Sequence, residues 1–391
     1  MCIADSCGNR EGEESVEQFL GGLLRDLEHH CVMLRDRLAA IPADPDVRTH
    51  ALQAYREVEI IRREVVQLLH DPSLGLSILL PNHLQLYKRW SERVSVIESY
   101  PFLFVERYAP SDRQMTRLCQ RLTAQIGWPL PSPLVAAFSN QYYWAMPEFN
   151  IICVPAAEGT TLLGLPDLCH ELGHILLLAQ WDALVGDFLR ELASYILQEQ
   201  RRVGTEQRPK EYRPLYNQLF MQWKDAWLLE FVSDMVATYL VGPAFGWQHV
   251  RLCAGNSLAA YHPTLGERAD HPADEARLRG IVAVLTRMGA AEAGARITAL
   301  WDSYLEASRE TRPQDYEVCY PQALLDSLAE RIVAGCRSLG VRGFDQPGGP
   351  PNDLPSLFGE AWERFLADPE TYAAWERSQI ETLWQELDVG I

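Results

Sequence analysis

The sequence predicts a mainly α-helical protein with a small β-sheet, an α+β fold. Apolar residues recur at three- and four-residue steps over much of the 391-residue chain, as expected of helices that bury one face. One segment between prolines breaks this pattern with β-branched and aromatic residues, which favour strands. With 47% hydrophobic and 23% charged residues, the chain has the composition of a globular protein with a large core.

The charge balance excludes some classes of partner. Asp and Glu outnumber Lys and Arg by 53 to 35, giving a formal net charge of −18. Such a surface repels phosphates and anionic lipids, so we expect no nucleic-acid partner. The most apolar stretch, 162–185, is interrupted by ionisable residues, which argues against membrane insertion. Nine cysteines without paired spacing and an N-terminus without signal-peptide features lead us to expect a cytoplasmic protein.

Residues 1–134 are predicted to form a helical N-terminal region that contains a helical hairpin. Two apolar stripes flank the breaker IPADPD, one from Val16 to Leu38 and one from Ala51 to Leu68. The first stripe consists of Val16, Leu20, Leu23, Leu27, Cys31, Leu34 and Leu38. We expect both stripes to pack on the protein's own core, and the alternative is a coiled-coil surface for a partner.

Residues 135–289 are predicted to form the middle domain, after the proline-rich segment at 126–134. Ile151 to Val154 is a predicted strand, and a helix should begin near Pro166 because proline suits a first helical turn. A second apolar helix should run from about Leu215 to Val241 and end at Gly242-Pro243. Residues 199–214 look like an exposed connection. Residues 290–391 are expected to form a helical C-terminal region, interrupted by a Gly/Pro-rich loop at 343–355.

The sequence His170-Glu171-Leu172-Gly173-His174 has the spacing of a zinc site. Histidines four residues apart on a helix project from the same face and can share one tetrahedral ion. Zinc lowers the pKa of a bound water, and Glu171 can accept its proton as a general base. Gly173 leaves space over the helix for a close approach of backbone or substrate. The alternative is a buried helix whose histidines bond to neighbouring carbonyls.

A catalytic zinc needs a third protein ligand, and Glu230 is the best candidate. It is a carboxylate in the apolar helix WLLEFVSDMVATYL, and Asp234 follows one turn later. Asp234 can accept the free N–H of a ligating histidine, the usual support for such a ligand. Glu191 and Glu199 are rival ligands, which we expect to lie in a more polar, less enclosed stretch.

A third motif, in residues 261–281, supplies candidates for stabilising an oxyanion. His262 and His271 each precede a proline, and Arg277 and Arg279 follow on a predicted helix. We expect His271 and Arg277 to lie near the site, more so than Arg279 and His262. The alternative is that Arg277 ties the loop to a carboxylate and His271 caps a turn.

Together, HELGH (170–174), EFVSD (230–234) and HPADEARL (271–278) resemble the gluzincin metallopeptidases, most closely the CAAX prenyl proteases and their soluble relatives. The resemblance covers roughly residues 140 to 285. It implies a zincin-like core flanked by the helical N- and C-terminal regions. It also implies one zinc ion on His170, His174 and Glu230, with Glu171 as general base, Asp234 supporting a histidine, and His271 and Arg277 near the cleft. The chain departs from the prenyl proteases in lacking a predicted membrane span.

These features predict a zinc-dependent hydrolase, most simply a metallopeptidase acting on a peptide or protein. One alternative is a helical interaction protein with a structural or degenerate metal site, and another is a metallohydrolase for a non-peptide amide. The strand at 150–154 could pair with an extended peptide as an added edge strand, and His271 or Tyr261 could hold the oxyanion. Trp223, Trp227, Trp247 and Tyr239 could line a pocket, although aromatic residues at helical spacing are more often core.

Overall fold

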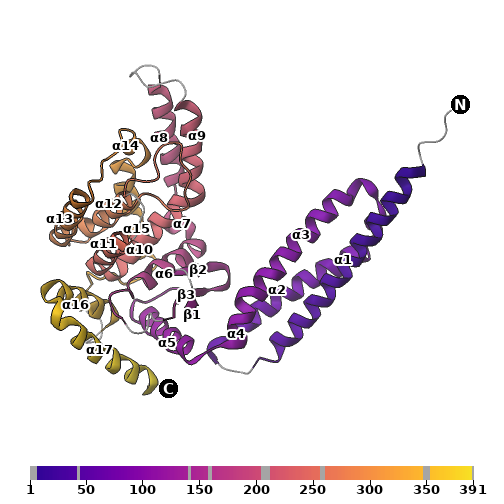
Figure 1. The fold of residues 1–391 in the computed structure, drawn as a ribbon, viewed down its shortest axis with the longest axis horizontal. Helices are drawn as coiled ribbons and strands as arrows, with labels where there is room; N and C mark the ends of the chain where they lie inside the picture. The colour runs from indigo at the N-terminus through magenta and orange to yellow at the C-terminus, as the bar shows by residue number, and fades with distance from the viewer. Residues whose placement is uncertain are drawn as a thin grey trace. The chain divides into compact units, whose positions relative to one another are not determined.

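A computed structural model describes residues 7–41, 45–139, 142–156, 161–203, 212–255, 260–346 and 353–389. It is mainly α-helical with one three-stranded sheet, which confirms the predicted fold class (Figure 1). The chain divides into two compact units, Met1–Arg113 and Gln114–Ile391. The division therefore falls ahead of residue 134, and residues 290–391 belong to the same unit as the middle of the chain.

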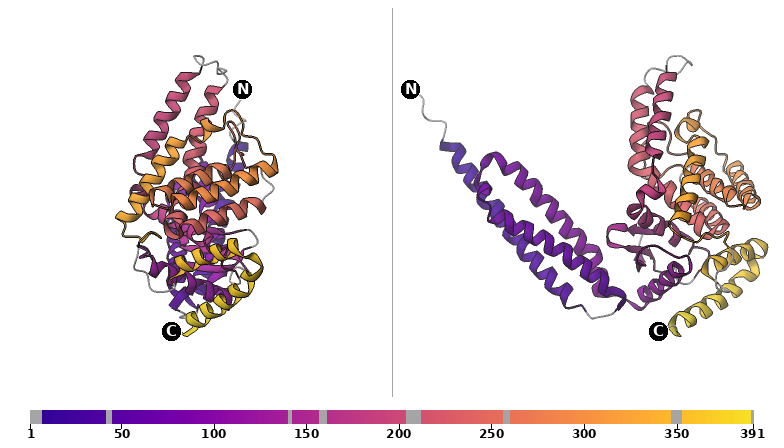
Figure 2. Two further views of the ribbon diagram at one scale, coloured as in Figure 1. Left: turned by 90° about the vertical axis from the view of Figure 1, so that its left-hand side faces the viewer. Right: turned by 180° about the vertical axis from the view of Figure 1, so that it is seen from behind.

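The first unit is a set of long helices. Its elements are α1 (Cys7–Ala39), α2 (Pro45–Leu69), η1 (Pro72–Gly75), η2 (Ser77–Leu79), α3 (Leu80–Ile97), the π-helical turn η3 (Glu98–Phe102) and α4 (Leu103–Arg107). Helices α1, α2 and α3 lie side by side (Figures 1 and 2). The predicted hairpin is thus present, and α3 adds a third helix to it.

The buried hydrophobic residues of α1 and α2 repeat every seven positions, in alternating steps of four and three. In α1 they are Leu20, Leu24, Leu27, Cys31, Leu34 and Leu38, and in α2 they are Val47, Ala51, Ala54, Val58, Ile61, Val65 and Leu68. This is the repeat of coiled-coil packing. Leu24 takes the position that we assigned to Leu23, and Val16 lies outside the described side chains. The stripes pack within this unit.

The second unit contains the sheet. Its strands are β1 (Leu134–Ser139), β2 (Trp144–Met146) and β3 (Ile151–Pro155), in the order β1–β3–β2. Strand β3 confirms the predicted strand, pairing parallel with β1 and antiparallel with β2. It therefore occupies the centre of the sheet, and the expectation that it serves a peptide as an edge strand is wrong. Its two neighbours already take both of its hydrogen-bonding edges.

Helices precede, interrupt and follow the strands along the chain. They are α5 (Pro110–Gln125), η4 (Pro147–Phe149), α6 (Asp167–Ala179), α7 (Trp181–Leu184), α8 (Phe188–Arg202), α9 (Tyr212–Gln222), α10 (Leu228–Val241), α11 (Pro243–Gly255) and α12 (Asp274–Arg287). Helix α6 begins directly after Pro166, as predicted, and lies against β2 and β3 on one side and α10 on the other. Helix α10 is buried on all sides, which suits its almost wholly apolar sequence.

The predicted helix 215–241 is one rod with an irregular centre. Helices α9 and α10 are joined by the π-helical turn η6 (Trp223–Trp227). The rod ends at Val241 because Gly242 adopts a positive φ of 60° and Pro243 begins the next helix. Helix α8 lies beside α9 (Figure 2). Residues 204–211 of the expected connection lie outside the described residues.

The C-terminal region packs onto this same unit. Its helices are α13 (Ala291–Ser308), α14 (Tyr316–Cys319), α15 (Gln322–Ser338), α16 (Leu354–Ala367) and α17 (Pro369–Val389). Helices α13 and α15 pack on α12, and α15 and α16 also reach α10. The central helix is therefore enclosed partly by segments that lie far from it in the sequence.

Among the described residues, no helix combines the length and apolar character needed to cross a membrane. Seven described cysteines are free and buried. These thiols pack in the interior, as the scattered spacing predicts.

Candidate metal centre

Helix α6 presents its two histidines on one face. His170 and His174 lie one turn apart, with their Nε2 atoms 3.1 Å from each other. The His170 residue is 8% exposed and the His174 side chain is 19% exposed. Donors bound at 2.0–2.1 Å to a tetrahedral zinc are separated by about 3.3 Å. The two rings are therefore spaced to share one ion.

Helix α10 approaches α6 very closely at Gly173. A Cβ atom at this position would lie 2.6 Å from Cα of Ser233, so only glycine fits. The space that we expected over Gly173 is thus filled by the backbone of α10. This contact brings the residues on either side of Ser233, namely Glu230 and Asp234, up to the histidines.

Glu230 completes a group of three ligand-type residues. Its Oε2 lies 3.5 Å from Nε2 of His170, and its Oε1 lies 3.5 Å from Nε2 of His174. The residue is only 8% exposed. The structure therefore brings together the three residues that the sequence assigns to zinc. Their separations match those expected for donors around one tetrahedral ion.

Asp234 lies behind His170, on the side away from this group. Its Oδ1 is 2.9 Å from Nδ1 of His170, which favours the tautomer that carries the proton on Nδ1. Nε2 then presents its lone pair to the metal group. Asp234 also accepts two hydrogen bonds of 2.7 Å from Nε and Nη2 of Arg277. Although burial raises the pKa of Asp234, the Arg277 guanidinium and His170 hold it below its usual range.

Arg277 thus reaches the site mainly through Asp234. Its Nη2 lies 3.7 Å from Oε2 of Glu230, too far for a hydrogen bond. The side chain is 12% exposed. These contacts agree with the alternative in which Arg277 ties its segment to a carboxylate.

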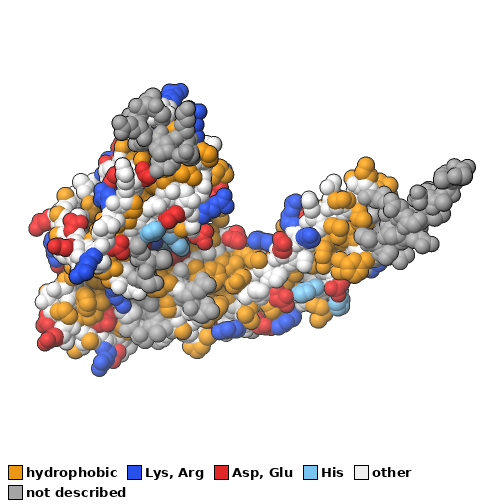
Figure 3. Space-filling model, turned by 45° about the horizontal axis from the view of Figure 1, so that its top comes forward, with side chains coloured by type: hydrophobic (Ala, Val, Ile, Leu, Met, Phe, Trp, Pro, Cys, Tyr) orange, Lys and Arg blue, Asp and Glu red, His pale blue; other side chains and the backbone are white. Residues whose placement is uncertain are grey.

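His271 borders the site from the surface. Its Nδ1 lies 2.9 Å from Oε2 of Glu230, while 66% of its side chain is exposed. On the second unit, Figure 3 shows histidine side chains in pale blue at the surface, with red carboxylate side chains close by. The ion-pair contact with Glu230 raises the pKa of His271. His271 is the exposed member of an otherwise buried cluster.

Glu171 is buried without a hydrogen bond on one of its oxygens. The residue is 4% exposed, and within the described part of the chain its Oε2 has no hydrogen-bond partner. Burial is the main reason that the pKa of Glu171 rises to about 7, and the nearby Glu230 raises it further. Such a carboxyl group can both accept and release a proton near neutral pH.

The cluster contains more buried negative charge than positive. The carboxylates of Glu171, Glu230 and Asp234 lie with the single guanidinium of Arg277. When all are ionised and the imidazoles are neutral, two negative charges remain unbalanced. Uncompensated charge is costly to bury, and a divalent cation would balance it. The residues present therefore fit a zinc ion in charge as well as in spacing.

The same charges set the pKa values of the two histidines. Burial lowers both, but Asp234 and Glu230 outweigh it at His170 and raise the pKa there to about 10. Burial and the neighbouring His170 lower the pKa of His174 to about 4. Metal binding at neutral pH must therefore displace a proton from the cluster.

The two rival carboxylates lie outside this group and have other partners. Glu191 accepts hydrogen bonds from Ser327 and Arg331. Glu199 is 2% exposed and pairs with Arg202. Our expectation that Glu199 lies in a less enclosed stretch is wrong, because the arginine one turn later neutralises it and lets it be buried.

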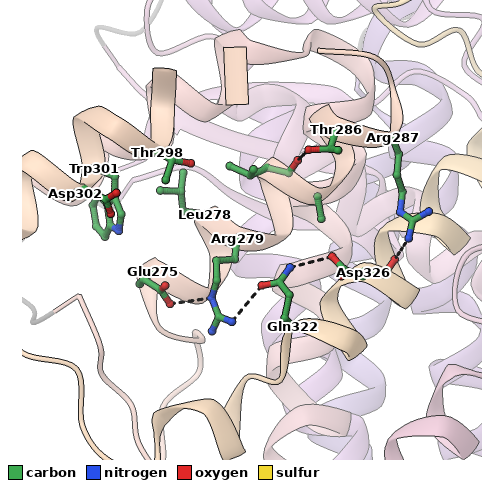
Figure 4. Close-up of a pocket in the computed structure, with 12 residues that line it drawn as sticks. Glu275, Leu278, Arg279, Thr286, Arg287, Thr298, Trp301, Asp302, Gln322 and Asp326 are labelled. Carbon is green, nitrogen blue, oxygen red and sulfur yellow. Dashed lines mark hydrogen bonds and ion pairs between the residues drawn. The ribbon is translucent and has the colours of Figure 1, made fainter. Parts of the chain in front are cut away.

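Three candidates of the third motif also lie elsewhere. Arg279 binds Glu275 and Gln322 at the wall of a separate pocket of about 630 Å³ between α12, α13 and α15 (Figure 4). His262 lies exposed against Glu267. Tyr261 is buried edge-to-face on Tyr316.

The aromatic residues considered for a substrate pocket are core residues. Trp223, Trp227, Trp247 and Tyr239 are all less than 5% exposed. Trp227 stacks on Tyr320, and Trp223 stacks on a phenylalanine of α10. The expectation that aromatic residues at helical spacing are core is confirmed.

One buried carboxylate near the site was missed from the sequence. Asp167, the first residue of α6, accepts hydrogen bonds from the Tyr142 hydroxyl and from Nε2 of Gln248. Burial raises its pKa, against these bonds and the nearby His170. The available signal was its position three residues before His170, which places both on one helical face. This network joins α6 to α11 and to the chain before β2.

Comparison of the chain with protein-family models, curated proteins and solved structures finds no match in any of the three.

Proposed function

We propose that the chain is a zinc-dependent hydrolase, most simply a metallopeptidase of the gluzincin type. The observation that carries this proposal is the convergence of His170, His174 and Glu230 beside the buried carboxyl group of Glu171, whose Oε2 has no hydrogen-bond partner among the described residues. Two imidazoles and one carboxylate form a common ligand set of catalytic zinc, which leaves a further position open. The residues fit this role by spacing, burial and charge.

These three side chains would hold a zinc ion, which would supply a Lewis acid that polarises a carbonyl and makes a water more acidic. Glu171 takes the proton of the attacking water and later delivers it to the leaving amine. Asp234 keeps His170 in the tautomer that presents Nε2. Arg277 keeps Asp234 ionised and in place, and is thus a positioning residue.

As water attacks the scissile carbonyl, negative charge develops on the carbonyl oxygen of the substrate. His271 is the exposed imidazole neighbour of Glu230, so it is the best placed side chain to donate a hydrogen bond there. This role needs the imidazole to turn from Glu230 toward the substrate. Its exposure leaves the ring room for such a turn.

A peptide is the substrate class that the sheet favours. Strand β2 lies at the margin of the sheet and contacts α6. An extended peptide could therefore pair with β2 as an additional strand beside the histidine helix. On its inner side, Ala145 and Met146 pair with β3. This assignment moves the peptide-binding role that we had given to β3 to its neighbour β2.

The test combines metal analysis with turnover of a quenched peptide library by the purified full chain. We expect zinc in the wild type, one equivalent less in His170→Ala and in Glu230→Ala, and the wild-type content in Glu191→Ala, the control for the rival carboxylate. Glu171→Gln should retain zinc and lose turnover.

Two outcomes would contradict the proposal. Turnover by Glu171→Gln equal to that of the wild type would remove the assigned general base. Stoichiometric zinc in a wild type that cleaves no peptide would instead favour a structural or degenerate site, or a hydrolase of a non-peptide amide.

A further inference from the structure

We infer that the chain has a second metal site, formed by His249, Cys253 and Asp274. Its ligand atoms, one imidazole nitrogen, the thiol sulfur and a carboxylate oxygen, all lie within 4.8 Å of one another. It shares no residue with the His170 cluster. The inference therefore stands independently of the proposed hydrolase activity.

The spacing on α11 explains how two of these ligands meet. His249 and Cys253 are four residues apart, so they project from one face of the helix. Nε2 of His249 lies 3.5 Å from Sγ of Cys253. On a tetrahedral zinc with Zn–N of 2.0–2.1 Å and Zn–S of 2.3 Å, such donors are separated by about 3.5 Å. The pair therefore has the separation of two ligands to one ion.

The third ligand comes from the start of α12. Asp274 is the first residue of that helix, and its backbone oxygen lies 3.0 Å from Nε2 of His249. Without metal, the imidazole can donate its N–H to this carbonyl. With metal, the neutral imidazole would carry its proton on Nδ1 instead, so that Nε2 could bind the ion and the carbonyl oxygen could serve as a fourth donor. Nitrogen, sulfur and oxygen would then surround the ion.

This donor set favours zinc over calcium or magnesium. A thiolate is a soft ligand that binds zinc well, whereas calcium and magnesium prefer oxygen alone. His249 is 2% exposed and Cys253 is 3% exposed. A thiolate ligand on a buried helix face is typical of structural zinc.

The position of this second site indicates a structural role. An ion there would fix α11 to the start of α12, and the same two helices support the first cluster. Phe245, one turn before His249, stacks on the His170 ring with a centroid distance of 6.1 Å. Arg277, three residues after Asp274, holds Asp234. The second ion would thus brace two of the side chains that contact the histidine site.

The test replaces zinc by cobalt in the full chain and reads the thiolate-to-cobalt charge-transfer band. The first cluster contains no sulfur ligand, so this band reports the second site alone. We expect the band in the wild type and in His170→Ala, and its loss in Cys253→Ser. Cys336→Ser is the matched control, because Cys336 is equally buried and belongs to neither metal cluster; it should keep the band.

Zinc content provides the second measurement. We expect two equivalents in the wild type, one in Cys253→Ser and one in His170→Ala. Asp274→Asn, at a more exposed position, covers the case in which the cysteine variant does not fold, and it should weaken cobalt binding at least tenfold.

A band that persists in folded Cys253→Ser, or unchanged cobalt affinity in folded Asp274→Asn, would overturn the inference. A single equivalent lost in His170→Ala and retained in Cys253→Ser would also overturn it and leave the proposed hydrolase site standing. A single equivalent lost only in Cys253→Ser would support the second site and remove the first.

Discussion

Gly173 lies so close to Ser233 that a single added methyl group would meet the backbone of the facing helix. A Cβ atom there would be 2.6 Å from Cα of Ser233 and 3.0 Å from its carbonyl oxygen. The obstacle is backbone, which cannot rotate away as a side chain can. The distance between α6 and α10, and with it the reach of Glu230 to the histidines, therefore depends on this glycine.

Gly173→Ala should push the two helices apart and destabilise the protein by about 1–3 kcal/mol, the usual result of overpacking a core. It should also weaken zinc binding, because Glu230 moves away from His170 and His174. Chemical denaturation and metal titration measure both effects. Gly359→Ala in α16 is the control, since a Cβ there meets nothing within 4 Å, and it should raise stability by up to about 1 kcal/mol. Unchanged zinc affinity in Gly173→Ala would contradict this account of the glycine.

Arg277→Met should destabilise the protein by about 3–5 kcal/mol, because the buried carboxylate of Asp234 loses its guanidinium partner and both hydrogen bonds from it. The double variant Asp234→Asn/Arg277→Met should lose less than the sum of the two single variants. A double-mutant cycle by urea denaturation measures this coupling. Strict additivity would mean that the two side chains do not act as a pair.

His271→Ala should lower kcat of the proposed hydrolase by about 100-fold while zinc content stays at the wild-type level. The physical reason is the loss of a donor to the developing oxyanion. His262→Ala is the matched control, because His262 is also exposed and also precedes a proline. Loss of zinc in His271→Ala would instead make this residue a ligand.

Asp353→Asn should destabilise the second unit at neutral pH by about 1–2 kcal/mol. Asp353 caps α16 through the backbone N–H of Ser356 and binds Arg342 at 2.6 Å. Burial raises its pKa, but these bonds outweigh it and leave the pKa below the ordinary value of 3.8. Asparagine preserves the cap, so the variant isolates the charge.

The sign of the pH effect comes from that lowered pKa. The unfolded chain takes up the proton more readily than the folded protein, so the stabilisation is complete above about 3.8 and is lost as the pH falls below that value. The free-energy difference between wild type and Asp353→Asn should shrink over the same window. A difference that is constant from pH 6 to pH 3 would be evidence against an ionised Asp353 as its source.

Local features of this protein are readable in its sequence, and features set by contacts between distant segments are not. The start of α6 after Pro166 and the end of α10 before Gly242 reflect backbone chemistry. Glu230 could be identified because a carboxylate in an apolar helix needs a partner. The central position of β3 could not, since strand order depends on which segments meet after folding.

A charged group can be buried when an oppositely charged side chain lies beside it, and this pairing is hard to see in the sequence. Glu199 is enclosed because Arg202 accompanies it. The pairing of His249 and Cys253 with Asp274 was also out of reach, because it requires the crossing of α11 with α12. In α1, the choice of Leu24 over Leu23 reflects a seven-residue repeat that a 3.6-residue pattern does not distinguish over a short stretch.

The π-helical turn η6 determines which side chains of α10 face the histidines of α6. A π-turn holds one residue more than an α-turn, and each added residue rotates the downstream helix by about 100°. The π-turn therefore fixes which face of α10 points toward α6, given which face of α9 points toward α8. Deleting one residue from Trp223–Trp227 would keep the rod straight but swing Glu230 and Asp234 away from α6. The length of this turn is thus as much a requirement of the site as the identity of its ligands.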